Sequence, residues 1–342
     1  MIQSQDHSKK FCNNRGLKQT NFSIFIYVSL VNFIHLRYEN ISIKLDWLGC
    51  ATFRLLIDDL TIFLDTYIDR VSAAPNVGIS TAEINKADFI FIGHSHYDHI
   101  GGADVIAKNT GAEVIGSNES ARILIEAGVP RKQLRRAQGG ERYRLIDSVT
   151  VRVYPSLHSY IWIPNTFRPK TDESQTGHLN LTENERWGPR KPDPLPSGTD
   201  PNLIKEIEKH GKETLGSNDI GGALCFLFET PQGSIFFQDT SGCWTGVVSD
   251  LRADAAILAM AGRPNIDGEP IQGSLTDYIG LMASMLKPKE IILGHHDDWM
   301  PPRTKDDSNP KSLKPVIDRI NLVRPGTIFH QPEYLGETEL LK

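Results

Sequence analysis

Short apolar segments alternate with amphipathic helical segments along most of this 342-residue chain. In the first half, the strand-like segments are separated by glycine and aspartate turns. The segment at 87–92 is apolar at nearly every position, as in a strand that is covered on both faces. The expected strands of this half are 43–47, 52–57, 61–64, 87–92, 113–115 and 149–154, and the expected helices are 101–108 and 120–127. This alternation favours an α/β fold.

The same signal returns after residue 220. Ser274 and Asp277 match a capping box, and the apolar residues after them follow helical spacing, so a helix is expected to begin there. The expected strands of this half are 223–229, 234–238 and 290–293. The chain is therefore expected to continue as strands and helices to near its end.

Two segments of the first half have similar counterparts in the second half. Residues 62–66 resemble 235–240, and residues 87–94 resemble 290–295. Chance similarity between short apolar strands is the alternative explanation. A true repeat implies two similar halves, with two sheets face to face and helices outside them. We therefore expect a four-layer αββα sandwich with one site where the halves meet.

Residues 159–220 have a different composition from the rest of the chain. They contain seven of the twenty prolines, many charged residues and few apolar ones. One local helix is expected, with Asp200 as its N-cap, Pro201 in its first turn and Gly211 at its end. A long insertion in a compact domain is often a lid or a specificity loop, and the alternative is a plain surface insertion.

The first 40 residues also differ from the remainder. Basic residues precede a mostly apolar run at 22–36, which is shorter than the roughly 20 residues that span a bilayer. We expect residues 1–40 to lie outside the fold and residues 41–342 to form one domain. A cytoplasmic protein is expected. The alternative is a protein that is exported, or tethered to a membrane through 22–36.

Composition removes some classes of protein. The formal net charge of −5 offers no broad basic surface, which argues against nucleic acid as a partner. The cysteines are far apart and show no CxxC spacing, which argues against a disulfide framework and against a thiolate zinc site. They are Cys12, Cys50, Cys225 and Cys243.

The run His-Ser-His-Tyr-Asp-His at 94–99 is the strongest chemical signal in the chain. It places three imidazoles and one carboxylate in a short loop directly after an apolar strand. Imidazole nitrogen and carboxylate oxygen are the donors of zinc-type sites, and a catalytic site needs further ligands from elsewhere. The run therefore predicts a metal site at the end of that strand.

The string His94-x-His96-x-Asp98-His99, followed by a lone His, an Asp and a final His after later strands, resembles the metallo-β-lactamase superfamily over about residues 41–335. The resemblance implies the αββα fold, with the insertion at 159–220, and two metal ions. It also implies a ligand set: His94, His96 and His158 for the first metal, Asp98, His99 and His295 for the second, and Asp239 between both.

Two positions in this pattern have alternatives. His295 and His296 compete for the last ligand, and His295 is preferred because it lies nearer to the strand end. Asp65 occupies a position where the family often keeps a carboxylate that accepts the other N–H of a metal-bound histidine. The alternative for Asp65 is a local role at its strand end.

The ligand set indicates two Zn²⁺ ions, with Mn²⁺ or Fe²⁺ as alternatives, because histidine dominates the donors. A zinc-type ion lowers the pKa of bound water toward about 7, which provides hydroxide at neutral pH. Asp98 or Asp239 is expected to orient this nucleophile and to pass its proton to the leaving group. The expected function is therefore a metal-dependent hydrolase with a small-molecule substrate.

The bond that is cleaved is less defined, because one fold serves many reactions. Loose similarity to the branch with ascorbate-phosphate lactonase and acyl-ethanolamine phospholipase D relatives favours an ester or lactone. The alternatives are a phosphodiesterase resembling phospholipase D and a metal-binding protein without turnover. Membrane contact and oligomeric state are left open. Candidate pocket residues are Trp162, Trp187 and Trp299, and candidate phosphate contacts are Arg168, Lys170, Arg190 and Lys191.

Overall fold

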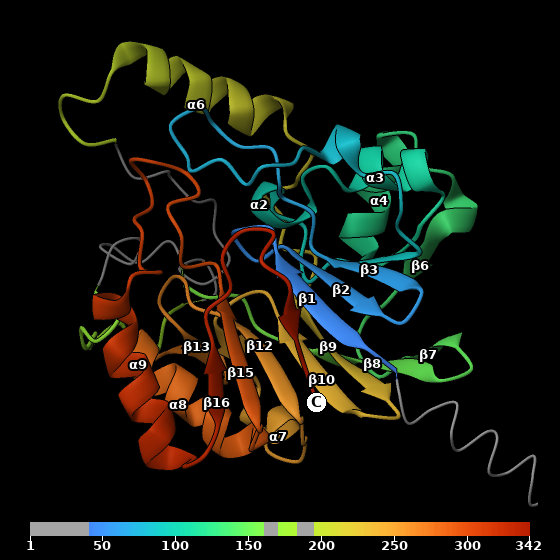
Figure 1. The fold of residues 1–342 in the computed structure, drawn as a ribbon. Helices are drawn as coiled ribbons and strands as arrows, with labels where there is room; N and C mark the ends of the chain where they lie inside the picture. Colours follow the sequence, from blue (N-terminus) through green and yellow to red (C-terminus); the bar gives the residue numbers. More distant parts are fainter. Residues whose placement is uncertain (1–40, 161–169, 183–194) are drawn as a thin grey trace, which may run out of the picture. The chain divides into compact units, whose positions relative to one another are not determined.

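The computed structural model describes residues 41–160, 170–182 and 195–342, and the remainder of this section concerns those residues (Figure 1). Several sequence predictions lie outside the described residues and stay predictions. They are the placement of 1–40, the apolar run at 22–36, the candidate pocket residues Trp162 and Trp187, and the candidate phosphate contacts Arg168, Arg190 and Lys191.

The first sheet is built mostly by the first half of the chain. Its strands are β1 (Ile43–Trp47), β2 (Phe53–Ile57), β3 (Leu60–Leu64), β4 (Phe89–Phe91), β5 (Glu113–Gly116), β6 (Leu134–Arg136) and β17 (Thr338–Glu339). Their order is β17-β1-β2-β3-β4-β5-β6. The pairs from β17 to β3 are antiparallel, and those from β3 to β6 are parallel. The C-terminal strand β17 thus pairs with β1 and forms the edge of the sheet.

The second sheet is built by later strands. These are β7 (Arg142–Ile146), β8 (Val149–Pro155), β9 (Leu224–Thr230), β10 (Gly233–Gln238), β12 (Ala255–Ala259), β15 (Glu290–Gly294) and β16 (Ile328–His330). Their order is β16-β15-β12-β10-β9-β8-β7. A small third sheet contains β11 (Gly242–Cys243), β13 (Asn265–Ile266) and β14 (Glu269–Pro270).

The two large sheets repeat one pattern of strand directions. In the second sheet the pairs from β7 to β10 are antiparallel and those from β10 to β16 are parallel, as in the first. The predicted equivalence of 62–66 and 235–240 agrees with this order, because β3 and β10 hold the same place. The equivalence of 87–94 and 290–295 was wrong by one strand, because the counterpart of β4 is β12 rather than β15.

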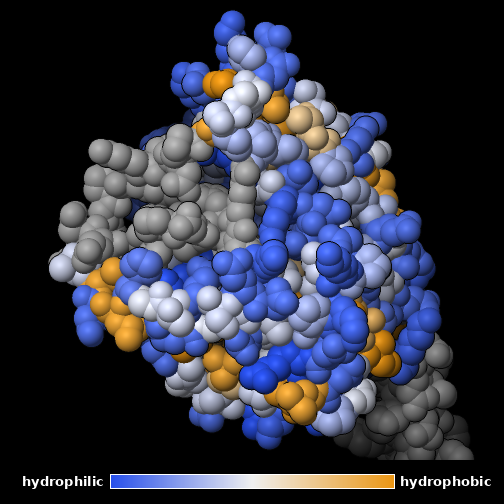
Figure 2. Space-filling view, turned by 90° about the vertical axis from the view of Figure 1, so that its left-hand side faces the viewer, coloured by the Kyte–Doolittle hydropathy of each residue, from blue (hydrophilic) through white to orange (hydrophobic). Residues whose placement is uncertain are grey.

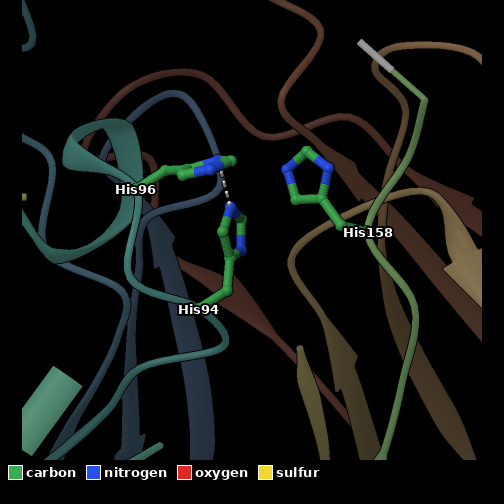
Figure 3. A group of neighbouring side chains, drawn as sticks. All are labelled: His94, His96 and His158. Carbon is green, nitrogen blue, oxygen red and sulfur yellow. Dashed lines mark hydrogen bonds between the residues drawn. The ribbon is translucent and has the colours of Figure 1, made fainter. Parts of the chain in front are cut away.

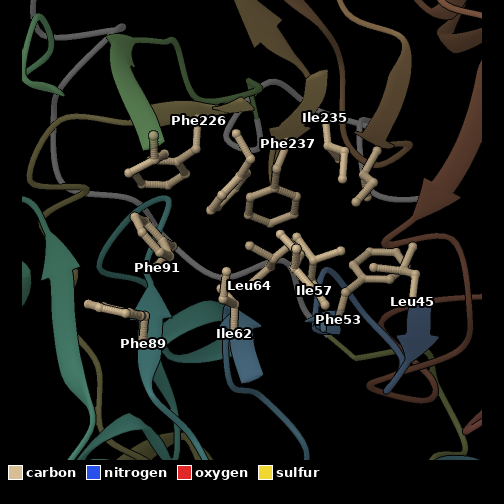
Figure 4. Close-up of a cluster of buried hydrophobic side chains, with 14 of the residues drawn as sticks. Leu45, Phe53, Ile57, Ile62, Leu64, Phe89, Phe91, Phe226, Ile235 and Phe237 are labelled. Atoms are coloured by element: carbon tan, nitrogen blue, oxygen red, sulfur yellow. The ribbon is translucent and has the colours of Figure 1, made fainter. Parts of the chain in front are cut away.

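Each sheet presents one face to the other sheet and one face to helices, so alternate residues of a strand enter different clusters. On β10, Ile235 and Phe237 lie in the core between the sheets, while Phe236 faces the helices. Aromatic rings meet across the central core (Figure 4). Phe91 of β4 lies edge-on to Phe226 and Phe228 of β9, with ring centroids 5.1 and 4.9 Å apart. This burial on both faces explains why the central strands are almost wholly apolar.

Helices form the two outer layers. On the first sheet, α3 (Ala103–Thr110) and α4 (Asn118–Glu126) pack against the outer residues of β4 and β5. On the second sheet, α7 (Thr245–Val248), α8 (Leu275–Leu286) and α9 (Pro310–Val323) cover β10, β12 and β15. The capping box of Ser274 and Asp277 starts α8, as predicted. The predicted α/β fold with four layers, αββα, is confirmed.

One more helix, α6 (Pro201–Glu213), lies in the insertion. Asp200 caps it, and its side chain accepts a hydrogen bond from the main-chain N–H of Asn202, as the sequence indicated. The predicted end at Gly211 was wrong: the helix continues to Glu213 and Thr214 caps it. Gly211 does not adopt the left-handed conformation that ends many helices, so it does not stop this one.

No helix within the described residues is long and apolar enough to span a membrane. The face in Figure 2 is mostly hydrophilic where it is coloured, and its apolar residues lie in small separate groups. Scattered apolar residues of this kind are normal on protein surfaces.

Candidate metal centre

The seven predicted ligands come together at one edge of the sandwich, just beyond the ends of strands from both sheets. His94 and His96 follow β4, and Asp98 and His99 lie in the short helix α2 (Tyr97–Ile100). From the second sheet come His158 after β8, Asp239 after β10 and His295 after β15. Donor atoms within 4.8 Å of one another form three groups: His94, His96 and His158; His94, His99 and Asp239; and Asp98 and His295 together with Cys50. Residues 201 positions apart in the sequence thus share one site.

The first group contains His94, His96 and His158 (Figure 3). His94 Nε2 lies 3.2 Å from His96 Nδ1. The ring of His158 stands 4.6 and 4.7 Å from the other two ring centroids. Tetrahedral zinc with Zn–N bonds of about 2.0–2.1 Å separates its nitrogens by roughly 3.3–3.4 Å. His158 Nδ1–H donates to the carbonyl oxygen of Ser159 at 2.6 Å, which leaves Nε2 for a metal.

The second group contains Asp98, His99 and His295. Asp98 Oδ2 lies 3.6 Å from His99 Nε2 and 3.4 Å from His295 Nε2, and the two imidazole nitrogens are 3.2 Å apart. The Nδ1 atom of buried His295 has no hydrogen-bond partner. Two nitrogens and one oxygen at these separations surround a common point, as the ligands of a cation do.

Asp239 lies between the two groups and is fully buried. Its Oδ2 is 2.7 Å from His94 Nδ1 and 3.3 Å from His99 Nδ1. Its Oδ1 has no hydrogen-bond partner, although buried carboxylate oxygens are normally satisfied. Gly93 leaves room for this carboxylate, because a Cβ atom there would collide with it. An unsatisfied oxygen at this place fits a neighbouring cation.

Asp65, at the end of β3, fixes the orientation of His99. Its Oδ2 accepts the His99 Nδ1–H at 2.8 Å, and its Oδ1 accepts the main-chain N–H of Gly93 at 3.0 Å. The predicted contact between Asp65 and a ligand histidine is present, and it directs His99 Nε2 toward the second group. Burial and the charge of Asp239 raise the pKa of Asp65 to about 7.

The electrostatics favour deprotonated donors, which is the form that binds metal. Burial, together with neighbouring imidazoles, lowers the pKa of His94 and of His158. Burial alone would raise the pKa values of Asp98 and Asp239, but the adjacent histidines outweigh it and hold both below the usual range. His99 differs from His94 and His158: burial lowers its pKa, but the carboxylates of Asp98, Asp65 and Asp239 outweigh burial and raise it well above the usual value. A cation at this place would take over the charge that these carboxylates otherwise stabilise as a proton on His99.

The geometry distinguishes His295 from His296. The ring of His296 stacks on Trp47, with centroids 5.0 Å apart and planes 10° from parallel. His296 Nε2 lies 3.4 Å from Gln331 Oε1. His296 therefore points away from the cluster, which favours His295 as the last ligand.

Sequence analysis missed Cys50, whose Sγ forms a third donor group with Asp98 and His295. It also missed the clamp beside Cys50, in which the carboxylate of Asp297 accepts hydrogen bonds from the main-chain N–H of Cys50 at 3.0 and 3.2 Å. Arg70 Nη1 donates to the same carboxylate at 2.7 Å, and the Tyr334 hydroxyl donates at 2.6 Å. Spacing along the chain contains no signal for contacts between residues so far apart.

An apolar wall of aromatic residues lies beside the second group. The ring of Trp299 is 5.4 Å from that of His295, and Tyr67 lies edge-on to both Trp299 and Tyr97. Helix α6 contributes to this wall through buried Ile207. The candidate pocket residue Trp299 is thus next to the site. Lys170, the one candidate phosphate contact within the described residues, is exposed.

The insertion also contacts the loop that carries His94 and His96 directly. His210 Nε2 of α6 lies 2.9 Å from the Tyr67 hydroxyl. Further on, Ser95 N–H donates to the Ile220 carbonyl at 3.1 Å, and Ser217 N–H donates to the Ser95 carbonyl at 2.9 Å. These contacts hold the last part of the insertion against the loop between His94 and His96.

Comparison with known proteins agrees with this site. A family profile, the beta-lactamase superfamily domain, matches residues 61–182. A UPF0173 metal-dependent hydrolase from Caldivirga maquilingensis is 34% identical over 296 residues, which cover 84% of this chain and 98% of that protein. A UPF0173 metal-dependent hydrolase from Pyrobaculum calidifontis is 32% identical over 117 residues, covering 34% of this chain and 51% of that protein. The structure of Igni18, a metallo hydrolase from Ignicoccus hospitalis, shares the fold, with a TM-score of 0.55 and 16% identity over 87% of this chain and 98% of that chain. The chain therefore belongs to the metallo-β-lactamase superfamily, as one of its metal-dependent hydrolases.

Proposed function

We propose that this protein is a binuclear zinc hydrolase that cleaves an ester or lactone bond of a small molecule. The observation that carries the proposal is the convergence of two donor groups on the shared carboxylate of Asp239. His94, His96 and His158 hold the first ion, and Asp98, His99 and His295 hold the second. Neighbouring ions of this kind polarise a substrate oxygen and lower the pKa of bound water to about 7.

The two aspartates have different roles in this scheme. The Asp239 side chain is fully buried, while that of Asp98 is 13% exposed. Asp98 is therefore the carboxylate that solvent and substrate reach. It accepts a proton from the attacking water and delivers it to the leaving oxygen, while Asp239 keeps His94 and His99 in place. Geometry thus favours Asp98 as the general base.

The aromatic wall supports a substrate with an apolar group next to the scissile bond. The rings of Tyr67, Tyr97 and Trp299 contact one another, with centroids 5.8–6.4 Å apart, and Trp299 also contacts the ring of His295. Apolar walls with a few polar groups are typical of small-molecule sites. The wall lies where part of a substrate would rest while its carbonyl faces the metals.

The charge next to this wall favours a carboxylic ester over a phosphodiester. Among the described residues, Arg70 is the buried cation beside this wall, and phosphate sites usually use such a guanidinium directly. Here Nη1 of Arg70 binds Asp297 at 2.7 Å and Nη2 donates to the Leu48 carbonyl at 3.3 Å. Its side chain is only 4% exposed, so it is committed to the protein rather than to a ligand.

Zinc stoichiometry and a substrate panel test the proposal. The panel contains a nitrophenyl ester, a lactone and bis-nitrophenyl phosphate. Wild-type protein is expected to bind two zinc ions and to hydrolyse the ester or the lactone. His96→Ala is expected to lose one ion and nearly all turnover, because it removes a donor from the first group. His330→Ala, at the far edge of the second sheet, is the matched control and keeps both properties.

Three outcomes contradict the proposal. Unchanged metal content and rate in His96→Ala would remove the ligand assignment. Full metal loading with turnover of no substrate would favour the metal-binding protein without activity. Turnover of the phosphodiester alone would replace the ester or lactone with phosphodiester chemistry.

A further inference from the structure

Cys50 lies in the tight turn between β1 and β2, on the rim of the second donor group. It is fully buried, and its Sγ belongs to the donor set that includes Asp98 and His295. The Sγ atom also lies 3.5 Å from the main-chain carbonyl of Asp98. Buried cysteines usually act as small apolar side chains, and their neighbours are then apolar as well. Cys50 has such apolar neighbours in Tyr67 and Trp299, but its Sγ also lies within 4.8 Å of a carboxylate oxygen of Asp98 and a ring nitrogen of His295.

The main chain of Cys50 is attached at two points to the loop that carries His295. The main-chain N–H of His295 donates to the Cys50 carbonyl at 2.6 Å, and the N–H of Cys50 donates to the Asp297 carboxylate. Arg70 donates to that carboxylate from the other side. These bonds hold the turn that carries Cys50 next to the loop that carries His295. The position of the sulfur is thus set by the same loop that sets the imidazole.

A second observation indicates a ligand at this place. His295 is 8% exposed, and its Nε2 atom faces the donor group, 3.2 Å from His99 Nε2. Asp98 Oδ2 is 3.4 Å from the same nitrogen of His295, with no hydrogen atom of its own to share when the carboxylate is ionised. A sulfur, an oxygen and a nitrogen that converge in a buried position form the mixed donor set that selects zinc over harder ions.

We infer that Cys50 is a metal ligand, which gives the second ion a thiolate alongside Asp98 and His295. The inference rests on the binuclear site proposed above and adds to it. On binding, the Cys50 S–H bond is replaced by a metal–sulfur bond, and the proton leaves to solvent. The thiolate would make the second position prefer zinc over Mn²⁺, because manganese favours oxygen ligands.

X-ray absorption at the zinc edge of the zinc-loaded, full-length protein tests this inference. A sulfur ligand gives a scatterer at about 2.3 Å, distinct from nitrogen and oxygen ligands at about 2.0–2.2 Å. Wild-type protein is expected to show one sulfur for every two zinc ions, and Cys50→Ser is expected to lose it. A variant that keeps Cys50 alone, with Cys12→Ser, Cys225→Ala and Cys243→Ala, is expected to retain it.

Cobalt substitution gives an independent measurement. Cobalt-loaded wild-type protein is expected to show a thiolate charge-transfer band in the near ultraviolet that is lost in Cys50→Ser and retained in the variant with Cys50 alone. If Cys50→Ser fails to fold, the wild type and that variant still decide the question.

The outcomes separate this inference from the proposed function. Two bound zinc ions with no sulfur scatterer would overturn the role of Cys50 and leave the binuclear hydrolase intact. A sulfur signal that persists in folded Cys50→Ser would also overturn it. Absence of bound zinc in the wild type would overturn both.

Discussion

Replacing Arg70 by methionine is expected to destabilise the folded protein, because it leaves the carboxylate of Asp297 buried without its cation. The side chains of Arg70 and Asp297 are 4% and 3% exposed, and their closest atoms are 2.7 Å apart. Removing one partner of a buried ion pair costs about 3–5 kcal/mol. Methionine retains much of the apolar stem of arginine, so the loss reports the charge rather than a large cavity.

The magnitude depends on how much support Asp297 keeps. After the substitution its carboxylate still accepts hydrogen bonds from the Cys50 N–H and the Tyr334 hydroxyl. These neutral donors do not compensate a buried charge fully, so we expect a cost of about 3 kcal/mol, the lower end of that range. Asp297→Asn is expected to cost a similar amount, because it leaves the guanidinium without a counter-charge. The double variant should cost less than the sum by about 1–3 kcal/mol.

The effect should also depend on pH. Burial raises the pKa of Asp297, but Arg70 outweighs it and keeps the pKa below the usual value. In the wild type this stability is present above the unfolded pKa of about 3.9 and is lost as the pH falls through the lower folded pKa. Without Arg70, the pKa of Asp297 in the folded protein lies above its value in the unfolded chain. Protonation of Asp297 then removes the unpaired buried charge. The cost of Arg70→Met should therefore shrink as the pH falls from neutral toward about 4.

Urea unfolding, followed by tryptophan fluorescence and circular dichroism at one fixed free zinc concentration, measures these costs. Metal content is determined for each variant, so that loss of zinc is not mistaken for loss of the ion pair. Additive effects of the two single substitutions, or a cost that does not change with pH, would refute the buried ion pair as the cause.

Three further substitutions test other parts of the site. Gly93→Ala should displace Asp239 and lower metal content and turnover. Gly246→Ala is the control and should change neither, because an added Cβ atom there has no neighbour within 4 Å. Equal behaviour of the two variants would contradict the close approach of Asp239 to Gly93. Asp65→Asn should weaken zinc binding by about 10–100-fold, because the imidazole it orients loses a carboxylate partner, and competition with a chelating dye measures this. Gly211→Ala should stabilise α6 by about 0.5–1 kcal/mol, because Gly211 is helical and has open space at its Cβ position. Slower hydrogen exchange of the amides in α6 would show this gain, and unchanged or faster exchange would count against it.

The convergence of the candidate ligands could be predicted from the sequence where these residues follow strong strand signals. The run at 94–99 directly follows a strand that is buried on both faces, and Asp239 and His295 also follow apolar strands. Parallel strands end at a common edge, so ligands after such strands meet without any knowledge of the loops between them. The apolar strand segments therefore supported the prediction that the His and Asp residues after them lie close together.

Other features could not be read because they depend on contacts across the fold. Strand β12 was missed because its sequence, Ala-Ala-Ile-Leu-Ala, is rich in alanine, which has a low preference for strands. Its neighbours β10 and β15 make it a strand by pairing with both of its edges. Cys50 and Asp297 are joined by hydrogen bonds over 247 positions, and no periodic pattern encodes such a pair. Gly211 indicated a helix end, but the local backbone stays helical past it.

The shared strand order of the two sheets has a consequence for how such a centre could arise. Two identical copies of one repeat, facing each other, would present the same loops. They could build only a symmetric set of ligands. In this single chain the turn after β4 carries His94, whereas the turn after its counterpart β12, Met260-Ala261-Gly262, carries no donor side chain. The second repeat contributes instead through the turns after β8, β10 and β15. Because both halves belong to one chain, their loops can differ, and the two proposed metal positions have chemically different surroundings within an almost symmetric frame.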